Sequence, residues 1–304
     1  MEAVIKPTPQ QQCFLDENGL DISYLQHAQK WFMPISAEIN EHQNGAKRPL
    51  IVAINGCQGS GKSTLAAYLE LTLNETFGLS VVAMSMDDFY LTKTERQQLA
   101  KSVHPLLATR GVPGTHDCHL MMDVIGALQR NETTAVPRFN KAVDDRFEAS
   151  QWTKVSSAVD VIIVEGWCWG IGPQPADSLI DPLNPLEAEQ DKQAVWRTYV
   201  NEQIIANYQP LYQLTDVMLM LKAPSFACVK QWRHQQEQKL AARLSADDDR
   251  SGLMSEQQIE TFISYFQRLT EHGLATLPAH SHVVWQLQAD RSISQVSRNK
   301  ELFL

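Results

Sequence analysis

The chain has 304 residues, with 26 Lys and Arg against 35 Asp and Glu, which gives a formal net charge of -9 at pH 7. Hydrophobic residues make up 43% of the sequence, enough for a packed core, and this excludes a wholly disordered chain. The acidic balance argues against nucleic-acid binding as the main function, while a small basic pocket for an anionic metabolite remains compatible with it.

The sequence shows no export or membrane signal. Its apolar runs at 51–54, 161–164 and 217–221 are strand-sized and too short to span a bilayer. The first residues lack the basic-then-apolar order of a signal peptide. The five cysteines form no C-x-x-C pair, which is typical of a reduced chain without disulfides or a zinc site. We expect a cytoplasmic protein that binds neither membranes nor nucleic acid, of an oligomeric state that the sequence does not fix.

Residues 1–48 are expected to form an N-terminal helical extension. Apolar side chains between Tyr24 and Phe32 recur at three- and four-residue spacings, as on one face of an amphipathic helix. Pro34 then interrupts or kinks that helix. We expect the extension to pack on the main domain, which we place at 49–304.

From residue 49 the pattern changes to buried strands that alternate with helices. Continuous apolar runs predict strands at 50–54, 79–86, 159–164, 217–221 and 282–287, and a helix is expected over 62–77. This alternation favours a three-layer α/β fold with a mainly parallel sheet flanked by helices. The long irregular stretch at 92–152 is interpreted as substrate-binding chain, and 170–189 as a surface excursion.

Residues 56–63 read Gly-Cys-Gln-Gly-Ser-Gly-Lys-Ser and match the phosphate-loop pattern G-x-x-x-x-G-K-[ST]. Glycines let the backbone coil around phosphate oxygens so that its N–H groups point inward, and the following helix adds its positive N-terminal end. Lys62 is expected to reach the β- and γ-phosphates, and Ser63 to ligate Mg²⁺. The predicted nucleotide contacts are Gly56, Gln58, Gly59, Ser60, Gly61, Lys62, Ser63 and Thr64.

Carboxylates follow two of the predicted strands. In an open parallel sheet, residues just past the carboxyl ends of the strands face the ligand crevice. Asp87 is the first choice for the base that accepts the proton of an attacking hydroxyl, with Asp88 as the alternative. Glu165 follows four apolar residues, which is the position of a Walker B carboxylate that holds Mg²⁺ directly or through water.

Cations gather between the second and third predicted strands. Arg110 and His116 flank a turn that contains Gly and Pro, and both are candidate substrate contacts. Asp117 in the same stretch has the alternative role of capping the following helix. Lys141 and Arg146 belong to a second basic stretch, for which the alternative is a solvated loop. Guanidinium and ammonium groups suit carboxylate and phosphate oxygens, so both stretches are candidates for binding an anion.

A helix with several cations is predicted after the fourth strand, near 225–250. Such a helix acts as a lid in phosphoryl transfer when it closes over the phosphates, excludes water and neutralises charge. Arg233 is the expected phosphate contact, with Lys239 and Arg243 behind it. The alternative is an ordinary surface helix of mixed charge.

Together these segments resemble P-loop kinases of the phosphoribulokinase and uridine kinase type, and more narrowly the D-glycerate 3-kinase family. The resemblance spans about residues 49–287, and its motifs lie at 56–63, 85–90, 110–117, 137–146, 165–167, 232–233 and 236–237. It implies that 49–304 is a kinase domain with ATP as phosphoryl donor, Mg²⁺ as metal and D-glycerate as acceptor, giving 3-phosphoglycerate. By position it implies that Asp87 is the base, that Lys62 and Ser63 contact the nucleotide, and that Arg233 belongs to the lid. We therefore expect Asp87, Lys62 and Arg233 to be catalytic. The expected substrate contacts are Asp88, Tyr90, Arg110, His116, Lys141 and Arg146.

Two other functions remain open. One is a kinase for another acceptor, namely a nucleoside, pantothenate or a sugar. A nucleoside would need aromatic stacking partners, which Phe89, Tyr90 and Phe139 could supply. A regulatory NTPase that recognises guanine would need Asn-Lys-x-Asp after a late strand. Residues 140–144 have one residue too many for that pattern and precede the third strand.

Overall fold

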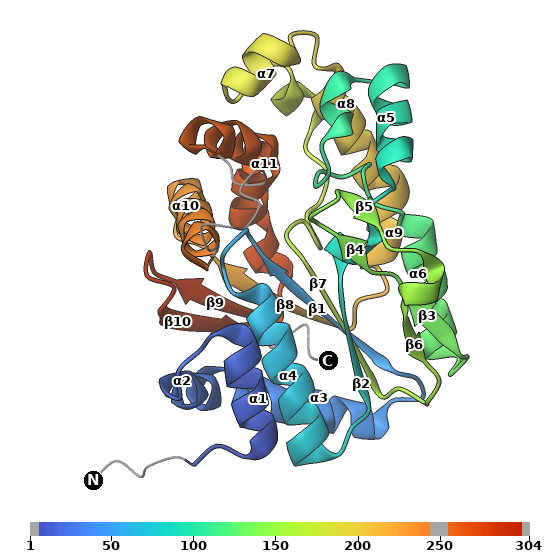
Figure 1. Ribbon diagram of the computed structural model, residues 1–304, viewed down its shortest axis with the longest axis vertical. Helices are drawn as coiled ribbons and strands as arrows, with labels where there is room; N and C mark the ends of the chain where they lie inside the picture. The colour runs from blue at the N-terminus through green and yellow to red at the C-terminus, as the bar shows by residue number, and fades with distance from the viewer. Residues whose placement is uncertain (1–5, 244–254, 300–304) are drawn as a thin grey trace.

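The chain folds around a six-stranded sheet with helices on both faces (Figure 1). The computed structural model describes residues 6–243 and 255–299. The sheet has the order β10-β9-β8-β1-β7-β2, and its strands are β1 (Leu50–Gly56), β2 (Val81–Ser85), β7 (Val161–Gly166), β8 (Val217–Lys222), β9 (Val283–Leu287) and β10 (Ile293–Arg298). All pairs are parallel except β9 with β10, which confirms the expected three-layer α/β fold with a mainly parallel sheet.

The neighbouring strands β1 and β7 lie inside the sheet and are buried on both faces because they are apolar at nearly every position. Every residue of β1 and β7 is buried. Ile51 and Ile162 belong to the apolar cluster on one face of the sheet, and Val52 and Ile163 to the cluster on the other. In this parallel register Ile54 lies opposite Glu165, so the loop after β1 begins beside that carboxylate.

The apolar cluster on one face includes residues of α1 (Pro9–Asn18), α2 (Ser23–Trp31), α3 (Met33–Gly45) and α4 (Lys62–Phe77) (Figure 1). As Pro34 predicts, the helix is interrupted there: α2 ends at Trp31, and α3 begins with Pro34 in its first turn. Phe14 and Ile35 share one cluster with Leu65 of α4. Residues 9–45 are therefore packed directly against the helix that follows the phosphate loop.

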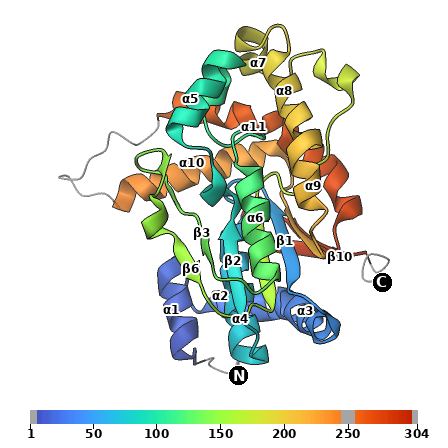
Figure 2. The ribbon, with the colours of Figure 1, turned by 90° about the vertical axis from the view of Figure 1, so that its right-hand side faces the viewer.

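The opposite face is covered by α6 (Cys118–Gln129), α8 (Val195–Gln203), α9 (Gln209–Tyr212) and α11 (Glu256–Thr276) (Figure 2). Helix α10 (Phe226–Arg243) follows β8 and buries Val229 and Trp232 in the cluster that also holds α4. Among the described residues, no helix has both the length and the apolar character that a membrane crossing requires.

The two irregular intervals contain more structure than the sequence indicates. The first holds α5 (Lys93–Ser102) and a small antiparallel sheet of β4 (Phe139–Asn140) and β5 (Asp145–Arg146). It also holds β3 (Thr134–Val136), which pairs with β6 (Thr153–Val155) just after the interval. The second includes α7 (Pro185–Gln190). Arg268 of α11 holds this second interval through the carbonyl oxygens of Ser178 and Asp181 and the buried carboxylate of Glu187. Strand β10 was not predicted.

Candidate active site

A cavity of about 350 Å³ opens at the carboxyl ends of β1, β2 and β7. Residues that are far apart in the sequence meet there, at the sheet edge where ligands of open α/β sheets bind. Its lining residues are Gln58, Gly59, Lys62, Ser63, Asp87, Tyr90, Arg110, Lys141, Glu165, Trp167, Arg233, Phe262 and Phe266. The structure thus brings together the phosphate loop, both strand-end carboxylates chosen from the sequence, and three predicted cations.

The phosphate loop connects β1 to α4 and depends on its glycines. Gly59 and Gly61 have φ angles of 76° and 94°, which side-chain-bearing residues rarely adopt. A Cβ on Gly56 would lie 2.4 Å from Ser60 Oγ, so a larger residue there would displace the Ser60 side chain. The N–H of Ser60 donates to the carbonyl of Cys57 at 3.1 Å and closes the turn. Of the predicted nucleotide contacts, Gln58, Gly59, Lys62 and Ser63 line the cavity, and the others belong to the same loop or the first turn of α4.

Lys62 and Ser63 both face Glu165. The Ser63 hydroxyl donates to Oε1 of Glu165 at 2.8 Å, and Nζ of Lys62 lies 3.6 Å from Oε2. Burial alone would lower the pKa of Lys62, but the negative charges of Glu165 and Asp87 outweigh it and raise that pKa. Oε2 of Glu165 is buried and accepts no hydrogen bond. A hydroxyl and an unsatisfied carboxylate oxygen side by side are the ligand type that Mg²⁺ prefers.

Asp87 points into the cavity from a 3₁₀ turn at Met86–Phe89 that follows β2 directly. Its Oδ1 accepts a hydrogen bond from the Tyr90 hydroxyl at 2.7 Å, and its Oδ2 pairs with Nζ of Lys141 at 2.7 Å. Burial alone would raise the pKa of Asp87. Lys141, Lys62 and the two hydrogen bonds outweigh burial and hold that pKa well below its usual range, so the carboxylate is ionised and able to accept a hydrogen bond.

Asp88 points elsewhere, although it is adjacent to Asp87 in the sequence. Its Oδ2 pairs with Arg138 at 2.9 Å, and its Oδ1 accepts from the N–H of Phe139 at 3.1 Å. Burial raises the pKa of Asp88 despite these partners. Asp88 therefore anchors the short strand β4 to the end of β2, and only Asp87 of this pair lines the cavity.

Besides Lys62, three cations line the cavity, each with an acidic partner in the protein. Lys141 pairs with Asp87, Arg110 with Asp144, and Arg233 with Glu237 at 2.8 Å. The guanidinium groups also lie against aromatic rings: Arg110 is 5.4 Å from the centre of the Phe139 ring and Arg233 is 5.8 Å from that of Phe262.

The predicted lid helix extends beyond the described part of the chain. Residues 244–250 and the side chains of Lys239 and Arg243 lie outside the described residues.

Two predicted contacts, His116 and Arg146, lie behind the cavity wall. The ring of His116 packs 4.6 Å from that of Tyr90, and its Nδ1 is 2.7 Å from the hydroxyl of Tyr208. The same hydroxyl accepts a hydrogen bond from the N–H of Gly114 at 2.9 Å. Arg146 donates to the carbonyl oxygen of Tyr90 at 2.9 Å and pairs with Asp117 at 3.4 Å. Both side chains thus contact Tyr90 and hold it in place.

Sequence reasoning missed the aromatic wall of the cavity. Trp167 follows β7, and Phe262 and Phe266 come from α11. The indole N–H of Trp167 donates to the carbonyl oxygen of Gly111 at 2.8 Å, and a Cβ on Gly111 would lie 2.6 Å from the Phe266 ring. The absence of a Cβ at Gly111 is thus what lets the Arg110 segment approach α11 closely. The glycine at position 111 was the one sequence feature that pointed to this close approach. It did not identify the helix involved, because α11 lies about 150 residues further along the chain.

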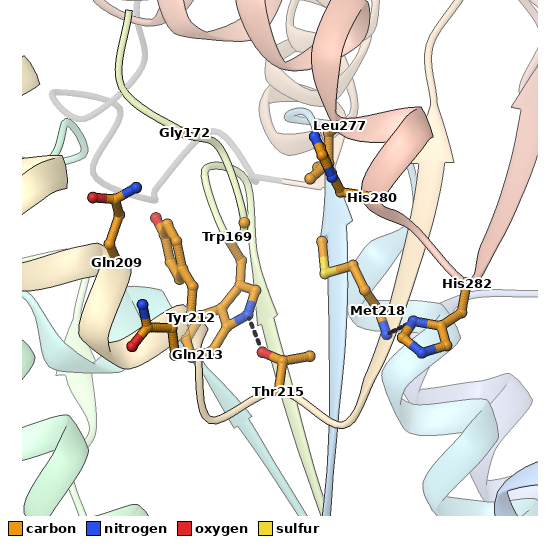
Figure 3. A pocket seen from close by; sticks show the side chains of 11 residues that line it. Trp169, Gly172, Gln209, Tyr212, Gln213, Thr215, Met218, Leu277, His280 and His282 are labelled. Atoms are coloured by element: carbon orange, nitrogen blue, oxygen red, sulfur yellow. Dashed lines mark hydrogen bonds between the residues drawn. The ribbon is translucent and has the colours of Figure 1, made fainter. Parts of the chain in front are cut away.

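A second cavity, of about 290 Å³, lies at the amino ends of β8 and β9 (Figure 3). Two of its polar side chains have protein partners: Trp169 donates to Thr215 at 3.0 Å, and His282 accepts from the N–H of Met218 at 2.9 Å. It contains none of the residues selected from the sequence. The cavity at the carboxyl ends of the strands is therefore the candidate active site.

Known kinases are among the proteins whose sequences are similar to this chain. No family model matches the chain. The Schizosaccharomyces pombe protein named uncharacterized kinase mug58 is 34% identical over 245 residues, which cover 78% of this chain and 85% of that protein. The chloroplastic D-glycerate 3-kinase of Arabidopsis thaliana is 32% identical over 243 residues, which cover 76% of this chain and 49% of that protein, so the match spans about half of the plant enzyme.

Solved structures show the same fold. D-glycerate 3-kinase from Cryptococcus neoformans superposes with a TM-score of 0.71 at 24% sequence identity, covering 87% of this chain and 96% of that one. The chain therefore belongs to the family of P-loop kinases that includes mug58 and D-glycerate 3-kinase.

Proposed function

We propose that this ATP-dependent kinase transfers the γ-phosphoryl group of ATP to a hydroxyl of D-glycerate, giving 3-phosphoglycerate. The observation that carries the proposal is that an ionised carboxylate, Asp87, faces the phosphate loop across a cavity that also holds Lys141 and Arg110. The relationship to D-glycerate 3-kinase supports the choice of acceptor.

The nucleotide phosphates would lie against the loop of residues 56–63. Backbone N–H groups of the loop and the N-terminus of α4 would bind the β- and γ-phosphates, and Lys62 would supply a positive charge there. Arg233 on α10 faces the same cavity from the other side. Together they would stabilise negative charge on the phosphoryl group as it is transferred.

Asp87 is the proposed general base. As the hydroxyl oxygen of the acceptor attacks the γ-phosphorus, its proton passes to the carboxylate of Asp87, the bond to the β-phosphate oxygen breaks, and ADP leaves. The hydrogen bond from Tyr90 fixes the carboxylate so that one oxygen is held by Tyr90 and the other faces Lys141. Tyr90 and its supports, His116 and Arg146, are thus proposed to orient the base.

Mg²⁺ is the proposed metal. The hydroxyl of Ser63 and the carboxylate of Glu165 would hold it, directly or through water, and the unsatisfied Oε2 of Glu165 fits this role. When bound, the ion would neutralise charge on the phosphate oxygens. Glu165 also keeps Lys62 protonated, so the cation is present at the loop over the whole physiological pH range.

The acceptor carboxylate would be bound by Lys141 and Arg110. Both cations line the cavity, and both have acidic partners that an incoming carboxylate would replace. Arg96, which is almost fully buried, also contacts Asp144 at 2.9 Å and keeps that carboxylate in place when Arg110 turns to the ligand.

A second candidate is a kinase for an acceptor with a ring. Phe262 and Phe266 line the cavity together with Tyr90, and aromatic rings of this kind stack on nucleosides. This reading keeps the same donor, base and metal and changes only the acceptor.

A panel of acceptors in a coupled ADP assay tests these proposals. D-glycerate is expected to give the highest kcat/KM, glycerol a low value because it lacks the carboxylate, and uridine, pantothenate and sugars values near background. Arg110→Gln should raise the KM for D-glycerate by about tenfold without changing that for ATP. Preferred turnover of uridine would favour the second candidate, and ATP hydrolysis unaffected by any acceptor would favour a regulatory NTPase.

A reducing compartment such as the cytoplasm is proposed for the protein. All five cysteines are free thiols, and Cys57, Cys118 and Cys168 are buried. Burial raises the pKa of the Cys57 thiol to about 12, so it stays protonated beside the phosphate loop.

A further inference from the structure

A hairpin outside the cavity contacts both the phosphate loop and the lid helix α10. It joins β9 to β10, and Figure 1 shows it beside α10. Arg291 in its turn has a φ angle of 71°, in the left-handed region that favours Gly and Asn. The chain thus keeps an arginine where another residue type would fit the backbone better, which points to a use for the side chain.

The guanidinium group of Arg291 reaches two separate segments. Its Nε donates to the carbonyl oxygen of Gly59 at 2.6 Å, and its Nη1 donates to Oε1 of Gln235 on α10 at 2.9 Å. The group also lies 5.1 Å from the centre of the Trp232 ring. One side chain therefore connects the phosphate loop to the lid helix.

On the loop side, Arg291 fixes a peptide group at the tightest point of the turn. The peptide between Gly59 and Ser60 has its carbonyl oxygen bound by Arg291 and its N–H bound by the carbonyl of Cys57. With both ends held, the peptide plane cannot rotate. The N–H groups that follow are thus presented in a fixed direction, which is what a phosphate-binding loop needs.

On the lid side, the hairpin holds α10 at Trp232. The fully buried indole donates to the carbonyl oxygen of Ala289 at 2.7 Å. A Cβ on Gly59 would lie 2.8 Å from Cβ of Trp232, so the loop and the helix are in direct contact. The next residue along α10 is Arg233, which lines the cavity. The contacts that hold Trp232 therefore also determine the position of Arg233 at the cavity.

We propose that Arg291 is a positioning residue for phosphoryl transfer, which locks the Gly59 turn of the phosphate loop against the lid helix from outside the cavity. It does not line the cavity, so it acts through Gly59 and Arg233. The effect on the transfer step rests on the proposed function. The effect on nucleotide binding does not, because it requires no acceptor.

Arg291→Gly tests the proposal sharply, because glycine suits the left-handed backbone and removes only the side chain. Relief of the left-handed backbone should offset part of the lost contacts, so the full-length variant should fold and melt within a few degrees of the wild type. Its Kd for a non-hydrolysable ATP analogue, measured by calorimetry, should rise about tenfold with the loss of a charge-assisted hydrogen bond. The KM for ATP should rise and kcat should fall. Arg291→Asn, the other residue that suits this backbone, should behave the same way.

Arg298→Gln is the matched control, since Arg298 is on the same hairpin and pairs with Glu38, away from the loop. It should leave the Kd for the analogue unchanged. Wild-type affinity in folded Arg291→Gly would overturn the proposal, as would an equal loss of affinity in Arg298→Gln. If the wild type bound the analogue but did not turn over D-glycerate, the proposed acceptor would be refuted while Arg291 kept its role.

Discussion

The carboxylate of Asp87 and the ammonium group of Lys141 are direct partners, with Oδ2 and Nζ 2.7 Å apart. The proposed base and a proposed acceptor-binding cation therefore share one ion pair. If the carboxylate of an acceptor paired with Lys141, Lys141 would no longer pair with Asp87. Oδ2 of Asp87 would then be available to accept the proton of the reacting hydroxyl. Acceptors without a carboxylate would leave the pair closed, which gives the site a physical means of discriminating against glycerol or water.

The first prediction concerns the base. Asp87→Asn should lower kcat for D-glycerate by at least ~10²-fold with little change in the KM for ATP, because the amide retains the shape of the side chain but accepts no proton. Steady-state kinetics with Mg-ATP measure this. Asp88→Asn is the neighbouring control. It should lower the melting temperature, because Asp88 holds Arg138 and Phe139, and it should leave kcat within a few-fold of the wild-type value. Full activity in Asp87→Asn would exclude Asp87 as the base.

The second prediction concerns pH. Lys141 contributes to the low pKa of Asp87, so Lys141→Met should let that pKa rise toward its ordinary value. On acidification the variant would then lose its ionised base at a higher pH than the wild type, and the acidic limb of kcat/KM should move to higher pH. A pH–rate profile measures the shift. Lys101→Met, which removes an exposed lysine at the end of α5, should show the wild-type profile. An unshifted acidic limb in Lys141→Met would contradict the coupling.

The third prediction concerns the metal. Glu165→Gln keeps an acceptor for the Ser63 hydroxyl but removes the negative charge. The Mg²⁺ concentration for half-maximal rate should rise by about tenfold or more, as is usual when a carboxylate that serves a metal is lost. Binding of ATP in excess chelator should not weaken, since Lys62 then faces less negative charge. Glu132→Gln, on the surface beside Arg130, should leave the metal dependence as it is. If Glu165→Gln also left the metal dependence unchanged, Glu165 would be excluded as a metal ligand.

The fourth prediction concerns stability. Burial lowers the pKa of His116 from 6.5 to about 4 in the folded protein. As the pH falls below 6.5, His116 becomes protonated in the unfolded chain but stays neutral in the folded protein. The free energy of unfolding should therefore decrease by about 3 kcal/mol between pH 6.5 and pH 4. Denaturant unfolding at several pH values measures this slope.

His116→Gln should flatten the slope of that stability curve, even though its absolute stability is lower after loss of the contacts with Tyr90 and Tyr208. His119→Gln, which changes an exposed imidazole on α6, should keep the slope of the wild type. An equally steep acid dependence in His116→Gln would assign the effect to other groups.

The sequence predicted those parts of the molecule whose signal is local. The strands at the centre of the sheet are continuous apolar runs, and the phosphate loop is a motif with a strand before it and a helix after it. Glu165 could be selected because it ends such a run. In these segments neighbouring residues dictate the backbone, so reading along the chain was sufficient.

The features that the sequence did not predict depend on the direction in which a side chain points or on contacts between residues far apart in the chain. Asp87 and Asp88 have the same chemistry, and only the 3₁₀ turn after β2 decides which one faces the cavity. Strand β10 was missed because only Ile293 among its residues is buried, so it lacks the apolar run of the inner strands. The link between Arg291 and Gly59 joins positions 232 residues apart, and no local pattern reports such a contact.

The packing of residues 9–45 on α4 has a practical consequence. Phe14, Leu25 and Ile39 belong to one apolar cluster with Leu65 and Leu69, only a few residues after the phosphate loop. A shortened protein beginning at residue 49 would expose these leucines to solvent and leave the first turns of α4 unsupported. Such a truncation would be prone to aggregate and to bind ATP weakly, so expression for crystallography or screening should retain the three leading helices.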